Sequence, residues 1–199
     1  MTDSGPVGEA APAARPGKRK RLVAAAAELM YRQGVARTTL ADIAQAADVP
    51  LGNVYYYFKT KDDIVGAVVE AHADRIESTL AELERRHRSP KRRLKALMSV
   101  LAKRADAIAQ YGCRYGTLCS ELAKRAEGSD PPAARLMQIL LDWTEQQFRA
   151  MGRRDAHDLA VELVASYEGS AVLTSALGQP ELMARQTRRL QLWIEALQA

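Results

Sequence analysis

The sequence predicts an all-α protein with a small N-terminal three-helix domain and a larger C-terminal helical bundle. Apolar residues recur at helical spacing in every segment after residue 15, and no convincing alternating strand pattern appears. Capping residues, glycines and prolines divide the chain at intervals typical of helices. About nine helices are expected, over residues 18–33, 40–47, 51–57, 61–87, 90–110, 116–126, 132–151, 155–177 and 181–197.

Local signals place the ends of these helices. Helix starts are marked by two T-x-x-D capping boxes and by two prolines at the first helical position: Thr39–Asp42, Thr60–Asp63, Ser89-Pro90 and Asp130-Pro131. Helix stops are marked by Gly34, Gly152 and Gly178.

The positive charge of the chain is concentrated near its N-terminus. The 199 residues carry a net charge of +5. The segment from Arg15 to Lys61 contains nine basic and three acidic residues, so its excess is larger than that of the whole chain. This distribution indicates a polyanionic partner. We expect a disordered tail over 1–14, because it is rich in Ala, Pro and Gly, then domains over 15–66 and 67–199.

Several classes of protein are excluded by what the sequence lacks. The cysteines, Cys113 and Cys119, are too few for a disulfide scaffold. There is no apolar run long enough for a membrane span, and no apolar core of a signal peptide, so a cytoplasmic protein is expected. Because His72, His87 and His157 lack metal-ligand spacing and no catalytic motif is present, we expect no metal, no cofactor and no enzyme activity.

Residues 38–61 form the most informative segment. A short helix over 40–47 carries an apolar stripe made by Leu40, Ile43, Ala44 and Ala47. A turn of about three residues leads to a second short helix over 51–57. Such a pair is a helix-turn-helix, whose second helix lies in the major groove of DNA with its N-terminal residues at base edges.

The residue types of this segment suit DNA recognition. Asn53 can read an adenine edge, Leu51 can contact a thymine methyl group, and Gly52 permits close approach of the backbone. Thr39 and Lys61 stand at helix starts that can bind phosphate. Consecutive tyrosines point about 100° apart, so at least one of the three at 55–57 is expected in the core. The predicted DNA-binding residues are Thr38, Thr39, Leu51, Gly52, Asn53, Tyr55, Tyr56, Tyr57, Lys59 and Lys61.

Residues 18–66 resemble the DNA-binding domain of the TetR family of bacterial transcriptional regulators. The matched positions, in order, are Gly34, Thr38-Thr39, Ile43-Ala44, Ala47, Val49, Gly52, Val54-Tyr55, Phe58 and Thr60-Lys61 before Ile64. The resemblance implies a dimer on a palindromic operator of double-stranded DNA. Two positions depart from the pattern, since Asp48 replaces the usual turn glycine and Pro50 the usual serine. Aspartate tolerates the left-handed conformation, so we expect the turn to survive.

Residues 67–199 resemble the family only in architecture, which implies a helical domain for ligand binding and dimerisation. The helices over 155–177 and 181–197 are expected to form a four-helix interface in a homodimer, because small residues on the first allow close approach. The alternative is that both helices pack within one chain.

The helices between residues 90 and 151 can enclose a cavity of a few hundred Å³, roughly the size of other small-molecule sites. The predicted ligand-binding residues are Met98, Leu101, Cys113, Tyr115, Leu118, Leu122, Met137, Trp143 and Tyr167. The expected ligand is a small apolar or electrophilic molecule. For each residue, the alternative is ordinary core packing.

The stretch over 112–122 is similar to a G-C-x-x-G-x-L segment of one TetR subgroup, which includes regulators of enzymes that handle reactive electrophiles. Arg114 follows Cys113 near a helix start, and this arrangement could lower the pKa of the thiol. Cys113 would then be a sensor residue. The alternative is a small buried cysteine that packs a tight turn.

These observations predict a repressor that a small-molecule inducer releases from its operator by shifting the helix over 61–87. Two other hypotheses stay open: a DNA-binding regulator without a ligand, and a thiol-based electrophile or redox sensor acting through Cys113. A helical enzyme is disfavoured because no paired catalytic residues are present.

Overall fold

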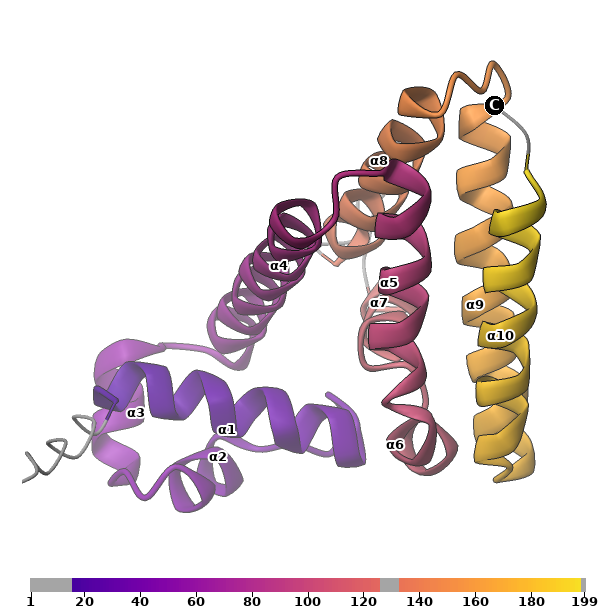
Figure 1. Cartoon of the computed structure of the whole chain (residues 1–199). Helices are drawn as coiled ribbons and strands as arrows, with labels where there is room; N and C mark the ends of the chain where they lie inside the picture. The colour runs from indigo at the N-terminus through magenta and orange to yellow at the C-terminus, as the bar shows by residue number, and fades with distance from the viewer. Residues whose placement is uncertain (1–15, 126–132, 198–199) are drawn as a thin grey trace, which may run out of the picture.

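The computed structural model describes residues 16–125 and 133–197, which form helices joined by turns, with no strand among them (Figure 1). The helices are α1 (Lys18–Gln33), α2 (Leu40–Ala46), α3 (Leu51–Tyr57), α4 (Lys61–Arg86), α5 (Pro90–Ala102), α6 (Ala105–Tyr111), α7 (Arg114–Ala123), α8 (Ala134–Ala150), α9 (Ala156–Leu177) and α10 (Pro180–Ala196). The predicted all-α class is confirmed. The predicted tail at 1–14 and the helix start at Asp130-Pro131 lie outside the described residues.

Helices α1, α2 and α3 form a small N-terminal domain around a shared apolar core. Helix α2 packs against both α1 and α3. Each of the three helices contributes residues with little or no exposed surface to this core, together with the residue that ends α3: Leu22, Ala26, Ile43, Val54 and Phe58. Burial of these side chains fixes the angle between α2 and α3.

Helix α4 links the small domain to the rest of the protein. It starts with the predicted capping box, in which the Thr60 hydroxyl accepts the N–H of Asp63 at 3.1 Å and the Asp63 carboxylate accepts the N–H of Thr60 at 2.9 Å. The helix leaves the small domain beside α1 and reaches α8 and α5 at its far end (Figure 1). It ends at Arg86, within one residue of the prediction.

The single helix predicted over 90–110 is wrong, because the chain forms α5 and α6 with a turn at Lys103 and Arg104. No glycine or proline marks this break in the sequence. The cause is tertiary: α5 packs against α10 and α8, whereas α6 packs against α9 and α10. The two segments therefore differ in direction because α8 directs the packing of the first and α9 that of the second.

Helix α7 begins two residues earlier than the prediction of 116–126. Gly112 has a φ of 80°, which only glycine adopts readily, and it ends α6. Cys113 then serves as the N-cap of α7, and its sulfur accepts the N–H of Gly116 at 3.5 Å. Gly116 lies inside α7, and the break in the chain falls at Gly112.

Helices α9 and α10 run side by side along one edge of the molecule (Figure 1). Their inner faces are buried against α8, α5 and α6. Their outer faces leave large apolar side chains exposed, at Val161, Val172, Leu173, Leu177 and Leu192. A cluster of this kind is unusual for a protein surface without a partner.

Candidate DNA-reading surface and ligand cavity

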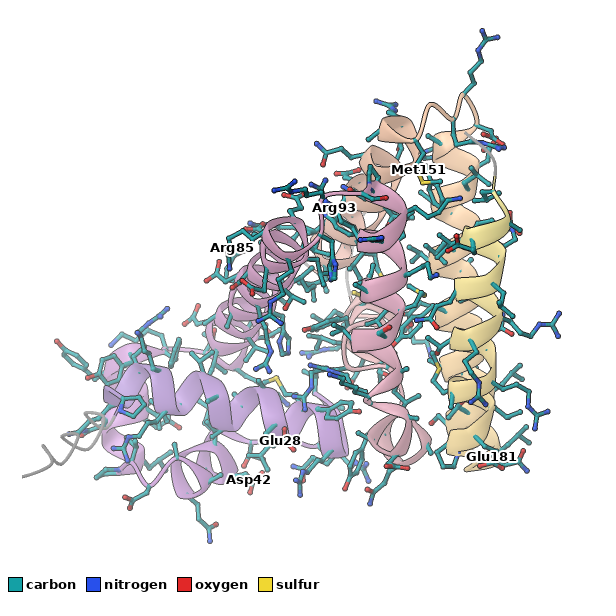
Figure 2. The ribbon with its side chains drawn as sticks, viewed as in Figure 1. Glu28, Asp42, Arg85, Arg93, Met151 and Glu181 are labelled. Atoms are coloured by element: carbon teal, nitrogen blue, oxygen red, sulfur yellow. The ribbon has the colours of Figure 1, made fainter. Side chains whose placement is uncertain are left out.

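The start of α2 is held by a complete capping box at Thr39 and Asp42. The Thr39 hydroxyl accepts the N–H of Asp42 at 3.1 Å and donates to the Asp42 carboxylate at 2.7 Å, which also accepts the Thr39 N–H at 2.9 Å. The hydrogen bonds from the Thr39 side chain and backbone lower the pKa of Asp42. Figure 2 shows Asp42 at the outer edge of the small domain, away from Arg85 and Met151.

Helix α3 presents an exposed N-terminal tip. The exposed fractions of Leu51, Tyr55 and Tyr56 are 42%, 48% and 77%, which are high values for large apolar side chains. Gly52 is exposed too, and a Cβ atom there would meet no neighbour within 4 Å. Asn53 is half-buried. The tip therefore offers apolar, aromatic and amide groups on one short helix.

The turn between α2 and α3 adopts the geometry expected of it. Asp48 has a φ of 49°, so it takes the left-handed conformation in place of glycine. Pro50 is the N-cap of α3 and provides no side-chain hydrogen bond, as its chemistry requires. The turn is thus preserved, although α3 starts without a capping hydroxyl.

Two of the three tyrosines point outward. Tyr57 is half-buried, packs against the core, and meets the Tyr56 ring edge-on with 5.0 Å between the ring centroids. Tyr55 and Tyr56 are exposed. This division agrees with the expectation that at least one of the three lies in the core.

The predictions for the polar residues of this surface need refinement. Thr38 is completely buried and its hydroxyl donates to the Gly34 carbonyl at 2.8 Å, so the prediction that it faces DNA is corrected. The ammonium groups of Lys59 and Lys61 donate to the carbonyls of Tyr55 at 2.9 Å and Ala36 at 3.1 Å. Both lysines remain partly accessible to solvent.

Helix α7 joins the small domain to the C-terminal bundle. The carboxylate of Glu121 accepts the backbone N–H groups of Val35 at 2.9 Å and Ala36 at 2.8 Å. Gly34 precedes them, and its missing side chain leaves room for that carboxylate, because a Cβ atom there would lie 3.3 Å from Glu121 Oε2. The loop before α2 is therefore fixed by a residue of the bundle.

A second junction lies at the other end of α7. The Tyr31 hydroxyl donates to the carbonyls of Ala107 and Gly112, each at 3.0 Å. The Arg114 guanidinium lies 4.0 Å from the Tyr31 ring centroid and donates to Glu28 at 3.0 Å. Glu28 stands on the half of α1 that approaches α6 (Figure 2). Hydrogen bonds from Arg32 and Arg114 lower the pKa of Glu28.

The C-terminal bundle encloses a cavity between α5, α6, α8 and α9. Its volume is about 30 Å³, much smaller than the few hundred Å³ expected from the sequence. Five of the predicted ligand residues line it, namely Met98, Leu101, Cys113, Tyr115 and Tyr167. In this structure the cavity has room for about one water molecule.

The other four predicted ligand residues do not line this cavity. Leu118 faces a smaller void beside Met30 and Val68, toward α1 and α4. Trp143 is directed toward α4, since its indole N–H donates to Glu84 at 2.8 Å. Leu122 is buried and Met137 is half-buried elsewhere in the bundle. Leu118 and Trp143 therefore face α1 and α4 rather than the cavity.

Sequence reasoning missed several residues of the cavity wall. The polar ones are Tyr31, Arg104, Arg114, Thr144 and Glu168. Tyr31 belongs to α1, so nothing in the C-terminal sequence could indicate it. Thr144 and Glu168 interrupt apolar stripes of α8 and α9, and a buried polar residue within such a stripe is the signal that could have revealed them.

The environment of Cys113 reverses the prediction for its thiol. Burial, followed by the nearby Glu168 carboxyl group, raises the pKa of Cys113 to about 12. The thiol donates a hydrogen bond to Glu168 at 3.1 Å. Arg114 does not lower this pKa, because its guanidinium is bound to Glu28 and stacked on Tyr31. A thiol kept protonated and buried is a poor nucleophile.

Residues 16–125 and 133–197 show neither a metal site nor a membrane-spanning helix. No group of three or more His, Cys, Asp or Glu side chains there could hold a metal ion. None of the helices in that part is both long and apolar enough to cross a membrane.

Comparison with known proteins agrees with this geometry. Residues 22–68 match the family model described as bacterial regulatory proteins, tetR family. The chain is 26% identical over 161 residues to the HTH-type transcriptional regulator TtgR of Pseudomonas putida, covering 76% of this chain and 77% of that protein. It is 29% identical over 168 residues to the HTH-type transcriptional repressor DhaR of a Mycobacterium species, covering 79% and 82%.

A solved structure supports the fold over nearly the whole chain. The TetR transcriptional regulator from Legionella pneumophila superimposes with a TM-score of 0.80 at 18% identity, covering 91% of this chain and 99% of that one. Residues 22–68 therefore form a DNA-binding domain of the tetR family, and the chain is similar over about three quarters of its length to bacterial transcriptional regulators.

Proposed function

We propose that this protein is a homodimeric repressor that binds a two-fold symmetric operator and is released when a small molecule enters the cavity between α5 and α9. The observation that carries the proposal is the pair of junctions at Glu121 and Tyr31. Through them, α6 and α7, which both contribute residues to the cavity wall, hold the loop before α2 and the end of α1.

The DNA-reading role falls on the exposed tip of α3. Leu51, Gly52 and Asn53 contact base edges in the major groove, and the exposed hydroxyls of Tyr55 and Tyr56 reach phosphate or base. Thr39 and Lys61 contact phosphates on either side. The basic run at 18–21 adds sequence-independent attraction.

The dimer forms through α9 and α10. Their outward apolar side chains, together with exposed small residues at Ala165 and Gly169, allow two copies to pack closely. A two-fold dimer sets the recognition helices at half-sites about one helical turn of DNA apart, or a multiple of it.

Ligand control acts by geometry. A molecule larger than the present volume of about 30 Å³ forces the walls of the cavity apart. Movement of α6 and α7 then pulls on α1 and on the loop at Val35, and α4 carries the same motion from the bundle to Thr60. The distance between the two recognition helices changes, and operator affinity falls.

The test is selection of bound DNA from a random pool by the full chain, without added ligand. A two-fold symmetric site is expected. Asn53→Ala should relax the preference at one position per half-site, whereas Lys61→Ala should weaken all sites alike and reduce the dependence on salt. Enrichment of no sequence, or of a site without symmetry, would overturn the proposal.

A second candidate is a DNA-binding regulator that needs no ligand, and the small volume of the cavity favours it. The two are separated by measuring operator affinity while the cavity is occupied. If a compound binds the protein and the affinity for the selected operator stays the same, the ligand-free regulator is the better description.

A further inference from the structure

Arg104 lies in a wall that separates two hollows of the protein. Outside it is a cleft of about 880 Å³, lined by α1 and α4 of the DNA-binding side and by residues of α6 and α7. Inside it is the cavity of about 30 Å³. Tyr31, Arg104 and Arg114 line both, and Arg104 sits in the turn at which α5 breaks from α6.

This wall is positively charged. Besides Arg104 and Arg114, Arg75 lines the cleft. Burial, followed by the charges of these three arginines, lowers the pKa of the buried His72 to about 4. Arg114 has a carboxylate partner in Glu28. Arg104 is half-buried, and within residues 16–125 and 133–197 it has neither a hydrogen bond nor an ion pair from its side chain.

The acidic residues of the cleft do not neutralise Arg104. Glu28 binds Arg32 and Arg114, and Glu70 binds Arg135. Asp63 is used in the capping box of α4. Asp74 is exposed on α4. A half-buried guanidinium beside apolar walls, without an acidic partner, is a site suited to a carboxylate.

The inner cavity adds a second polar group without a partner. Thr144 is fully buried in its wall, and its hydroxyl oxygen has no hydrogen bond. A buried hydroxyl left in this way has lost its hydrogen bonds to water without gaining one from the protein, so a polar ligand group that bonds it is favoured. Around it the wall is apolar, formed by Leu97, Met98, Ile108, Leu140 and Leu163. Glu168 also lines the cavity, and burial raises its pKa.

We propose that the effector of this protein is an amphipathic carboxylic acid, whose carboxylate pairs with Arg104 while its apolar chain enters the cavity past Thr144. The head group arrives through the wide cleft, and the chain opens the closed cavity at the turn between α5 and α6. The proposal rests on the ligand control described above, and it names the chemical class of the ligand.

The test is calorimetric titration of the full chain, in the absence of DNA, with linear carboxylates of six to twelve carbons and with 4-phenylbutyrate. Each is compared with its primary amide, which has the same shape and no charge. At least one carboxylate should bind, and its amide should bind at least about tenfold more weakly, as loss of a charge-assisted hydrogen bond implies.

Variants locate the binding site. Arg104→Gln should weaken the carboxylate at least about tenfold and leave the amide unchanged, whereas Arg104→Lys should retain most of the affinity. Lys103→Gln is the matched control, because Lys103 is the exposed neighbour that lines neither hollow. Circular dichroism establishes that each variant is folded.

Three outcomes would overturn the proposal: no carboxylate of the series binds, amide and carboxylate bind alike, or Arg104→Gln binds as well as the parent. None of these depends on operator binding. Failure here therefore leaves the DNA selection to decide the proposed function separately.

Discussion

The Glu121 carboxylate accepts the backbone N–H of Val35 at 2.9 Å, across 86 residues of sequence. Its other oxygen accepts the N–H of Ala36 at 2.8 Å. These two hydrogen bonds join the bundle to the loop before α2, so the orientation of α2 and α3 depends on α7 as well as on α4.

Glu121→Ala should therefore loosen the loop over residues 34–38. Loss of two hydrogen bonds to a charged acceptor should reduce the free energy of unfolding by about 1–3 kcal/mol. Amide hydrogen exchange should rise at Val35 and Ala36 more than in α9. Glu121→Gln keeps one carbonyl acceptor and should show a smaller effect. Equal amide exchange in Glu121→Ala and in the parent would show that the Glu121 hydrogen bonds do not stabilise this loop.

Gly116→Ala should disturb the contact between Cys113 and Glu168. A Cβ atom at Gly116 would fall well inside contact distance of the half-buried Glu168 carboxyl group. We expect destabilisation of about 1–3 kcal/mol, measured by denaturant unfolding.

Gly66→Ala provides the matched control for that substitution. Gly66 lies inside α4, where a Cβ atom meets no neighbour within 4 Å. Alanine there should stabilise the protein by about 0.5–1 kcal/mol through helix propensity. If both variants lose stability equally, crowding by Glu168 is not the cause.

Cys113 should react slowly with iodoacetamide at pH 7.5. Burial and Glu168 raise the pKa of its thiol to about 12, so the thiolate is scarce, and the sulfur is shielded. Peptide-resolved mass spectrometry should give a labelling rate less than about one tenth of that in the unfolded chain. Because this pKa lies above the ordinary value of 9.0, the protonated thiol contributes its full stabilisation of the folded state below about pH 9. That stabilisation is lost as the pH rises toward 12. Rapid labelling would restore the sensor hypothesis.

His72 should make the protein less stable in acid. Its pKa is lowered from 6.5 to about 4, so the folded state holds the neutral ring. The contribution to stability is present above about pH 6.5 and is lost as the pH falls toward 4. Between pH 7 and pH 4.5 the free energy of unfolding should therefore fall more in the parent than in His72→Gln. The difference between the two decreases should be about 1–3 kcal/mol. Identical pH profiles for the two proteins would contradict this.

Leu173→Arg should dissociate the proposed dimer and leave the fold intact. Leu173 is 58% exposed on α9 in the single chain, so arginine is tolerated there, but two buried copies in a symmetric interface would repel each other. Sedimentation velocity should show a monomer, with helical content unchanged by circular dichroism. Gln110→Arg, exposed on α6, is the control and should sediment like the parent.

The sequence by itself determined the helix-turn-helix and most helix boundaries. The capping boxes at Thr39 and Thr60, the left-handed turn at Asp48 and the tip at Gly52 are all encoded by residues within a few positions of one another. Such signals are local, and their geometry follows from backbone chemistry before any long-range contact forms.

The tertiary structure alone decided the environment of each polar group in the bundle. Burial, followed by the charge of Glu168, which reaches Cys113 across 55 residues, reverses the expected shift in the pKa of the thiol. The break that places Arg104 in a cavity wall has no sequence marker, because α5 and α6 follow different neighbours. Apolar spacing predicts which side chains are buried, but it does not predict which helix packs over them. The identity of that helix decides whether a buried side chain lines the cavity or belongs to the solid core.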